Sequence, residues 1–304
     1  MALTVVGAPL LKAQSAIIAV DAFNRKVHIA RGANDKRAVG GLAKIATAMV
    51  TLDWAEASNV GVNVLATVPP YALQIAGSNP LGLYPGDRAT LRDLICATMM
   101  SSDNVAAITL AHFVGADHLQ RLGQQGNPMG EFVRQMNNLA VREGAKRTKF
   151  TNPHGLENTR PMPYSTAADI SRLAIYAALR PAVRFYTSQA SRTMTVYRGE
   201  QQLNIELKNT NRLLGTERID GLKTGNTARS GGCVVISADR SSTAIPQANG
   251  GTTIFRHRMV VVVIGSADPF GEAQAILRQG WGTYDQWLAA GRPITSKEQM
   301  LTFY

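Results

Sequence analysis

Three short polar segments contain residue types that could act together in covalent catalysis. They are Gly41-Leu42-Ala43-Lys44, Ser102-Asp103-Asn104 and Lys223-Thr224-Gly225. Residue 41 and Lys44 are three positions apart, so on a helix their side chains would share one face. A serine at position 41 could therefore pass its proton to a neutral Lys44 amine, which would activate the serine oxygen as a nucleophile. The residue at this position is, however, a glycine.

The second segment could complete the proton transfers. Ser102 could relay a proton to the leaving amine, and Asn104 could hold the amide of a substrate. For Lys44 to act as the base, its pKa must lie well below the ordinary lysine value. Partial desolvation and the neighbouring charge of Lys223 would both lower the pKa of Lys44.

The third segment could bind the end of a peptide. Lys223 and Thr224 supply a cation and a hydroxyl for a terminal carboxylate. Gly225 would let an extended peptide lie close to a strand edge. The backbone N–H groups of Gly41 and Asn226 are the expected donors to an oxyanion.

The three segments stand in the order of the S-x-x-K, S-D-N and K-T-G motifs of penicilloyl-serine acyl transferases, and depart from them only at residue 41. Four longer stretches are similar to segments of one family and follow in family order: LGLYPGDRATLRDLICATMMSSDNVA, FVRQMNNLAVREGAKRTKFTNPHGLEN, YSTAADISRLA and NTNRLLGTERIDGLKTGNT. The chain thus resembles the low-molecular-mass D-alanyl-D-alanine carboxypeptidases, serine peptidases that are also penicillin-binding proteins. The likeness extends from about residue 16 to about residue 287.

The resemblance implies an α/β (α+β) fold of the β-lactamase/transpeptidase-like type, with an antiparallel sheet flanked by helices and an all-helical lobe. We expect an N-terminal extension over 1–15, a catalytic domain over 16–287 with the lobe at about 60–170, and a C-terminal tail over 288–304. We also expect a cleft between sheet and lobe that holds the site.

The family's chemistry is removal of the terminal D-Ala from the peptidoglycan pentapeptide through an acyl-serine intermediate, with β-lactams as further ligands and without a metal or other cofactor. When the family's site residues are transferred to this sequence, Lys44 resembles the general base. Ser102 and Asn104 resemble the second motif, and Lys223 with Thr224 resembles the site that binds the substrate carboxylate. The resemblance implies an extracytoplasmic protein, periplasmic or secreted. No signal peptide is evident, and the membrane anchor and β-rich second domain of many relatives are not expected here.

Gly41 leaves three interpretations open. A serine has been replaced in an otherwise intact enzyme, or the chain is a natural pseudoenzyme that binds wall peptides, or Lys44 activates a water for slow direct hydrolysis. In subtilisin, loss of the nucleophile lowers turnover by about six orders of magnitude. We therefore expect no acyl-enzyme. Thr47 and Ser101 are expected to serve structural roles instead of replacing the nucleophile.

A class A β-lactamase would share the three motifs and add a glutamate in an E-x-x-L-N loop. Residues 200–204, Glu-Gln-Gln-Leu-Asn, match that pattern. They lie close in sequence to Lys223 and inside an alternating strand pattern, so we expect Glu200 to face solvent. The stretches FTNPHGL and STAADI favour the peptidase.

The apolar pattern predicts the elements that would position these residues. Residues 16–32 predict a hairpin with its turn at Asn24 and Arg25. Periodicity predicts helices over 42–57, 90–100, 105–115, 130–145, 165–179 and 273–291, with Thr90 as the cap of the second and Ser165 or Thr166 as the cap of the fifth. Residues 72–89 read as loop. Strands are expected over 193–199, 201–207, 231–238 and 258–267, with one sheet built from both ends of the chain.

Composition excludes several other classes of function. The net charge of +11 comes from scattered Lys and Arg, without a basic run interleaved with aromatics, which argues against nucleic-acid binding. The five histidines are not spaced as metal ligands, and His154 is expected to support the cleft from a loop. Cys96 and Cys233 are expected to be buried free thiols, although a disulfide in an oxidising compartment is an alternative. Asp103 is expected to fix its loop through backbone hydrogen bonds.

Overall fold

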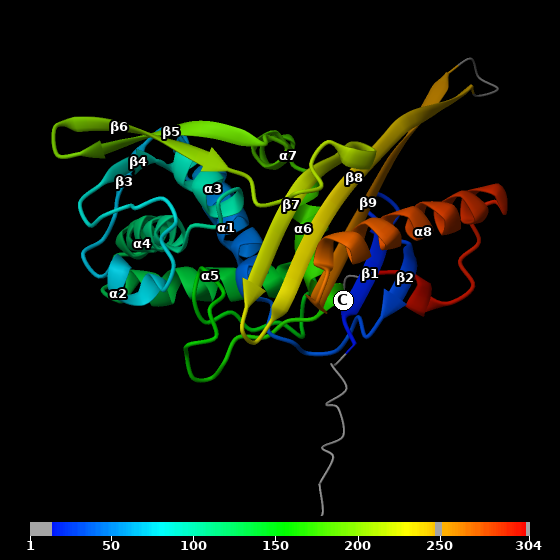
Figure 1. Ribbon diagram of the computed structural model, residues 1–304, viewed down its shortest axis with the longest axis horizontal. Helices are drawn as coiled ribbons and strands as arrows, with labels where there is room; N and C mark the ends of the chain where they lie inside the picture. The colour runs from blue at the N-terminus through cyan, green and yellow to red at the C-terminus, as the bar shows by residue number, and fades with distance from the viewer. Residues whose placement is uncertain (1–13, 247–250, 302–304) are drawn as a thin grey trace, which may run out of the picture.

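The main sheet is antiparallel, and its five strands come from both ends of the chain. A computed structural model describes residues 14–246 and 251–301. The strand order is β2–β1–β9–β8–β7 (Figure 1). The strands are β1 (Ala16–Asp21), β2 (Val27–Arg31), β7 (Ile219–Thr227), β8 (Gly231–Pro246) and β9 (Thr252–Ser266). Because β1 pairs with β9 along its whole length, the predicted union of the two ends in one sheet is confirmed.

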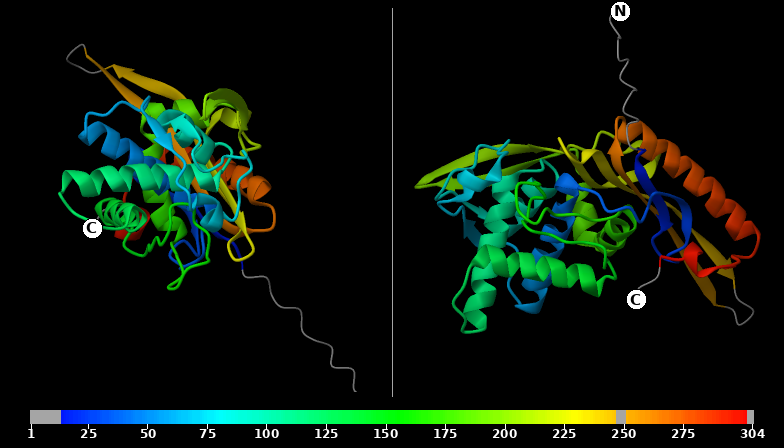
Figure 2. Two further views of the ribbon diagram at one scale, coloured as in Figure 1. Left: turned by 90° about the vertical axis from the view of Figure 1, so that its left-hand side faces the viewer. Right: turned by 90° about the horizontal axis from the view of Figure 1, so that it is seen from below.

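Both faces of this sheet are buried, which explains the unbroken apolar runs of its strands. Successive side chains of a strand point to opposite faces. Ile17 and Val263 pack with Leu277 of α8 (Pro269–Ala289) on one face. Ile18 and Val262 belong to the larger core that the other helices form on the opposite face. Figure 2 shows α8 lying along one face of the sheet, away from those helices.

The helices beside and behind the sheet position the candidate catalytic segments. A 3₁₀ turn (Gly40–Ala43) leads into α1 (Lys44–Ala57), so the predicted helix is present with a tighter first turn. The other predicted helices are α3 (Leu91–Met99), α4 (Asn104–Arg121), α5 (Pro128–Arg142) and α6 (Ala167–Ala178). Thr90, Asp103 and Thr166 cap α3, α4 and α6 by accepting hydrogen bonds from backbone N–H groups. Their side chains satisfy donors that a helix start leaves unpaired.

A second sheet differs from the sequence prediction. The expected strands near 193–207 form as β5 (Ser191–Arg198) and β6 (Gln201–Lys208), but they lie in a separate four-stranded sheet in the order β3–β4–β5–β6. Its other strands, β3 (Leu65–Thr67) and β4 (Arg88–Thr90), belong to the lobe that was expected to be all-helical. Strands of three residues are too short to show a period of two, which is why the sequence pattern missed them.

Two short helices were also missed. The region 72–89, predicted as loop, contains α2 (Ala72–Ala76), which ends at Gly77 in the left-handed conformation (φ 66°). A further helix, α7 (Pro181–Thr187), begins with a proline in its first turn. The expected extension 1–15 and tail 288–304 are described only from residue 14 and up to residue 301.

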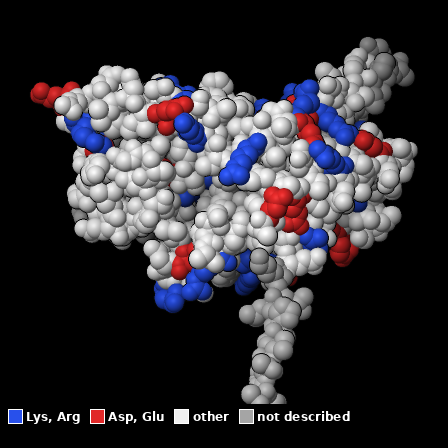
Figure 3. Space-filling view, in the orientation of Figure 1, with Lys and Arg blue, Asp and Glu red and all other residues white. Residues whose placement is uncertain are grey.

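Charged side chains do not gather into one basic face in the view of Figure 3. Lys and Arg lie there in separate small groups, many with Asp or Glu beside them. Of the helices that the structure describes, none combines the length and the apolar character needed to cross a membrane.

Candidate active site

The three candidate catalytic segments lie close together in the structure. Gly41 lies in the 3₁₀ turn before α1, Ser102 precedes α4, and Lys223 to Asn226 lie on the edge strand β7. A Cβ atom added to Gly41 would lie 3.1 Å from the Thr224 carbonyl oxygen, 3.3 Å from Ser102 Oγ and 3.4 Å from Gly225 Cα. A side chain at position 41 would therefore point into the space between the second and third segments.

Gly41 itself is not required by the backbone. Its φ lies outside the left-handed region, whereas the preceding Gly40 has φ +50° and an added Cβ there would lie 2.8 Å from Ser230 Oγ. Contacts of 3.1–3.4 Å around position 41 are tight but need shifts of only a few tenths of an ångström. A side chain at position 41 is therefore allowed by the backbone conformation, but it requires the Thr224 carbonyl, Ser102 and Gly225 to move by a few tenths of an ångström.

Lys44 is the first residue of α1 and is buried, with 2% of its surface exposed. Its Nζ donates a hydrogen bond to the His154 carbonyl oxygen at 3.0 Å. Burial lowers the pKa of Lys44 to about 8, and the nearby Asp103 carboxylate partly opposes this shift. Lys44 thus has the reduced basicity that a general base working near neutral pH needs.

Lys223 is a second buried ammonium group in the same place. Its Nζ donates to the Thr224 carbonyl oxygen at 2.7 Å, the same oxygen that faces the Gly41 Cβ position. Burial lowers the pKa of Lys223 well below the ordinary lysine value, and repulsion from Lys44 lowers it further. The sequence prediction placed this repulsion on Lys44, where burial and Asp103 are the causes that act.

The rest of the third segment is held close to the 3₁₀ turn. A Cβ on Gly225 would lie 2.9 Å from the Gly41 backbone nitrogen, so a glycine is needed for the strand to approach this closely. The Thr224 hydroxyl shares a hydrogen bond of 2.6 Å with the Thr210 hydroxyl. Asn226 is exposed at the end of β7, where it pairs in register with Gly232 of β8.

The second segment is fixed by its own helix start. Asp103 Oδ1 accepts from the Ala106 N–H and Oδ2 from the Leu81 N–H, as the sequence predicted for a residue that holds its loop. Burial raises the pKa of Asp103, against these hydrogen bonds and the charge of Lys44. Asn104 Nδ2 donates to the Ala76 carbonyl oxygen at 2.6 Å, so this amide also ties α2 to the site. Ser102 takes a positive φ of 59°.

His154 was predicted to support the cleft from a loop, and the structure confirms this prediction. The imidazole is buried and its pKa is lowered to about 3, first by burial and then by Lys44, so the ring stays neutral. Its backbone carbonyl accepts the Lys44 hydrogen bond. Asn152 Oδ1 accepts from the Gly155 N–H and holds this loop. Every residue has a backbone carbonyl, so the residue type at position 154 does not predict that this carbonyl accepts a hydrogen bond from Lys44. Only the turn-forming N-P-H-G pattern could have indicated the contact.

Other polar residues have structural partners. The Thr47 hydroxyl donates to the Pro153 carbonyl oxygen, and the Ser101 hydroxyl donates to the Lys208 carbonyl oxygen at 3.1 Å. Both were expected to serve structural roles. Cys96 and Cys233 are buried free thiols, as expected. Thr210, which contacts the site through Thr224, was not predicted, and no spacing in the sequence marks it.

Glu200 is placed away from the site. It lies in the turn between β5 and β6, at the far end of a hairpin whose other end holds Lys208 beside Ser101 (Figure 1). The seven residues 201–207 of β6 lie between Glu200 and Lys208, and seven residues of extended strand have a length of about 23 Å. This placement gives no support to a deacylating glutamate of the class A β-lactamase kind. Over the part of the chain that the structure describes, no group of three or more His, Cys, Asp or Glu is arranged to hold a metal ion.

Comparisons with known proteins identify similar chains. A family profile described as D-alanyl-D-alanine carboxypeptidase matches residues 3–247. D-alanyl-D-alanine carboxypeptidase DacF of Bacillus subtilis is 25% identical over 85% of this chain, and DacC of Escherichia coli is 28% identical over 92%. The alignments span 58% and 64% of the length of these two relatives. The crystal structure of the Streptomyces K15 DD-transpeptidase superposes with a TM-score of 0.73 at 23% identity, over 88% of this chain and 96% of that one. The superposition shows a shared fold.

Proposed function

Since the chain belongs to the D-alanyl-D-alanine carboxypeptidase family, we propose that its site binds the D-alanyl-D-alanine end of peptidoglycan stem peptides, as well as β-lactams. We propose further that the site is built for serine acyl transfer and that Gly41 prevents the acylation step. The observation that carries the proposal is the position of a Cβ on Gly41, 3.3 Å from Ser102 Oγ and one helical turn from Lys44.

The proposed mechanism assigns a role to each segment when residue 41 is a serine. The serine oxygen attacks the carbonyl carbon of the scissile amide, and neutral Lys44 accepts the serine proton. The backbone N–H groups of residue 41 and Asn226 hold the oxyanion. Ser102 passes a proton to the departing amine of D-Ala, and water then hydrolyses the acyl-serine ester.

Substrate binding is proposed to use the edge strand. The terminal carboxylate would lie by Lys223 and Thr224, and Asn104 would contact the peptide amide. A carboxylate beside Lys223 would favour its protonated form, because an opposite charge raises the pKa of an ammonium group. Burial and the charge of Lys44 both disfavour the protonated form of Lys223, so an anionic ligand beside Lys223 would relieve this cost.

A second function is favoured by Gly41 itself. In this second proposal the chain is a pseudoenzyme that binds wall peptides without cleaving them, since every other member of the proposed set is present. Hydrolysis by a water that Lys44 activates is a third alternative, and it lacks a group to align that water. We propose an extracytoplasmic location on the basis of family membership.

Labelling with a fluorescent penicillin tests the proposal. The chain with Gly41 is expected to take no covalent label, whereas Gly41→Ser is expected to take one label per chain and to release D-Ala from a pentapeptide. Gly41→Ala is the matched control, because it adds the same Cβ without the hydroxyl, and it should stay unlabelled. An inert Gly41→Ser variant that is folded as well as Gly41→Ala would overturn the acyl-transfer assignment and leave the binding function.

A further inference from the structure

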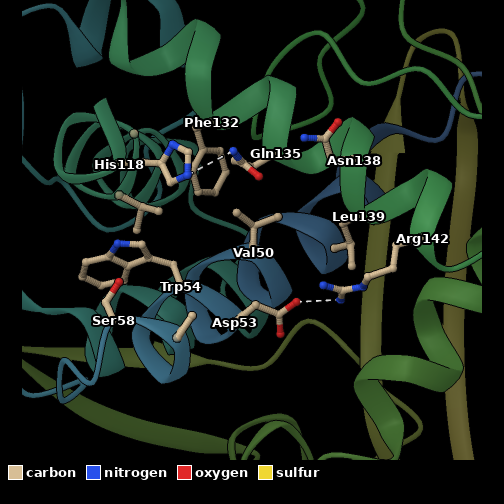
Figure 4. Close-up of a pocket in the computed structure, with 13 residues that line it drawn as sticks. Val50, Asp53, Trp54, Ser58, His118, Phe132, Gln135, Asn138, Leu139 and Arg142 are labelled. Carbon is tan, nitrogen blue, oxygen red and sulfur yellow. Dashed lines mark hydrogen bonds and ion pairs between the residues drawn. The ribbon is translucent and has the colours of Figure 1, made fainter. Parts of the chain in front are cut away.

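A cavity separate from the proposed active site lies between α1, α4 and α5 (Figure 4). Its volume is about 280 Å³. The lining comes from residues 50–58 of α1 and its cap, 114–118 of α4 and 132–142 of α5. None of the proposed catalytic residues lines it, so the proposed function leaves this cavity without a role.

The middle of the cavity is apolar and aromatic. Val50, Trp54, Phe132 and Leu139 surround it, and all four are buried (Figure 4). The Trp54 indole Nε1 donates to Asp117 Oδ2 at 2.7 Å, which fixes the plane of the ring. An apolar lining that includes the rings of Trp54 and Phe132 favours an aromatic ligand, which can pack edge-to-face or offset against these rings.

The polar groups at the two ends of the cavity already have charged partners. At one end His118 Nδ1 lies 2.7 Å from Glu131 Oε1, and at the other Arg142 Nη2 donates to Asp53 Oδ2 at 2.7 Å. A charged ligand would lose hydration on entry and would meet no uncommitted counter-charge, which is unfavourable. The amide of Asn138 also lines the cavity and can hydrogen-bond to a neutral polar group.

We propose that this cavity binds a small uncharged aromatic molecule that carries one hydroxyl or amide group. Its volume lies just below the range of about 300–1,000 Å³ that is usual for drug-sized ligands, so it suits a smaller molecule, and its mainly apolar lining with a few polar groups is typical of ligand sites. The same helices carry proposed catalytic residues at their other ends, Lys44 at the start of α1 and Asn104 at the start of α4. A ligand in the cavity therefore stabilises the folded arrangement of the helices that build the site.

Benzyl alcohol is a suitable probe, and Trp54 reports on its position. The chain has three tryptophans, and the other two, Trp281 and Trp287, lie on α8. In ¹⁵N–¹H spectra, titration should shift the indole signal of Trp54 saturably and leave the other two signals unchanged. Trp54→Phe assigns the signal. The melting temperature should rise by about 2–4 °C at a concentration well above Kd.

A pair of matched variants tests the location. Ala57 and Ala289 are both exposed and are the last residues of α1 and α8, but only Ala57 lines the cavity. Ala57→Phe should block the cavity and lower the affinity for benzyl alcohol at least about tenfold, whereas Ala289→Phe should leave it unchanged. Should Ala57→Phe melt at a clearly lower temperature than the parent, Asn138→Phe at the exposed edge of α5 provides the same block.

Three results would overturn the proposal. They are the absence of a saturable shift at Trp54, equal affinity in the blocked variant and in Ala289→Phe, and equal binding of benzylammonium or benzoate in place of benzyl alcohol. The first two results would show that benzyl alcohol does not bind in this cavity. The third would show that the cavity does not prefer an uncharged ligand. The readouts do not use acylation, so they are independent of the outcome of the penicillin experiment.

Discussion

Lys44 and Lys223 are two buried amines whose pKa values respond to different neighbours, Lys44 to Asp103 and Lys223 to Lys44. Each loses hydration on folding, and each therefore has a lowered pKa. Asp103 is the anion that acts on Lys44, and its own pKa is raised by burial. The protonation of this small group thus depends on three buried side chains at once. An anionic ligand would change that balance without any movement of the backbone.

The pH dependence of the restored enzyme follows from Lys44. In Gly41→Ser, the neutral amine is the active form, and its fraction rises about tenfold per pH unit below the pKa of about 8. The acylation rate with a fluorescent penicillin should therefore rise from about pH 6 and level off above about pH 8. A rate that stays flat over this range would rule out Lys44 as the base. Gly41→Ala gives the background at each pH.

Removal of the Asp103 charge should move this profile. Asp103 raises the pKa of Lys44, so Asp103→Asn in the Gly41→Ser background should shift the midpoint of the acylation profile to below pH 8. Asparagine caps a helix about as well as aspartate does, but its amide nitrogen cannot accept from the Leu81 N–H, so a fall in melting temperature of a few degrees is expected. A midpoint that moves upward would contradict the assigned electrostatics. A large fall in melting temperature would show instead that the carboxylate is needed for the fold of the loop.

At the scale of elements, the loop after Thr151 supports the 3₁₀ turn through a glycine. Gly155 has φ +88°, and a Cβ there would lie 1.9 Å from the Gly40 carbonyl oxygen. This contact holds the loop against the turn that carries residue 41, and the His154 carbonyl of the same loop accepts from Lys44. The geometry of the base therefore depends on a segment that contributes no reactive side chain.

Gly155→Ala should lower the stability of the fold and disturb the geometry of the candidate active site. The positive φ alone costs about 1–3 kcal/mol for a non-glycine residue, and the clash with backbone adds to it. We expect a loss of at least about 2 kcal/mol in the free energy of unfolding, measured by urea denaturation, and slower acylation in the Gly41→Ser background. Gly61→Ala is the control, because a Cβ there meets no atom within 4 Å. Equal stability of the two variants would contradict this account.

The elements that sequence reasoning found and missed differ in length and in the kind of contact they make. Helices such as α4 and α5 have many turns, so their apolar period is readable. The strands β3 and β4 have three residues each and are defined by their pairing with each other and, at Arg88 and Tyr197, by the pairing of β4 with β5. The motif set led to the expectation that Lys44, Ser102 and Lys223 share one site, whereas the His154 carbonyl and the Thr210 hydroxyl depend on tertiary contacts that no local pattern encodes.

At the scale of the whole molecule, the end of the described chain folds back on its beginning. The Leu301 N–H donates to the Arg25 carbonyl oxygen at 2.8 Å, and Met300 forms a bridge with Lys26. Leu301 is 3% exposed and belongs to the larger core. The hairpin β1–β2 is thus held on one side by β9 and at its turn by this segment, which lies beyond the expected limit of the catalytic domain at residue 287.

Leu301→Ala should show how much the returning segment contributes to the stability of the fold. Truncation of a buried leucine removes apolar contact and leaves a cavity, which typically costs about 2–5 kcal/mol. We expect the free energy of unfolding to fall by about 2–3 kcal/mol, the lower part of that range, since surrounding residues can relax into part of the gap. Ile294→Ala in the same segment is the matched control, because Ile294 is 47% exposed and should change stability by about 0.5 kcal/mol or less. A loss of about 0.5 kcal/mol or less for both substitutions would mean that the burial of Leu301 contributes little to the stability of the domain.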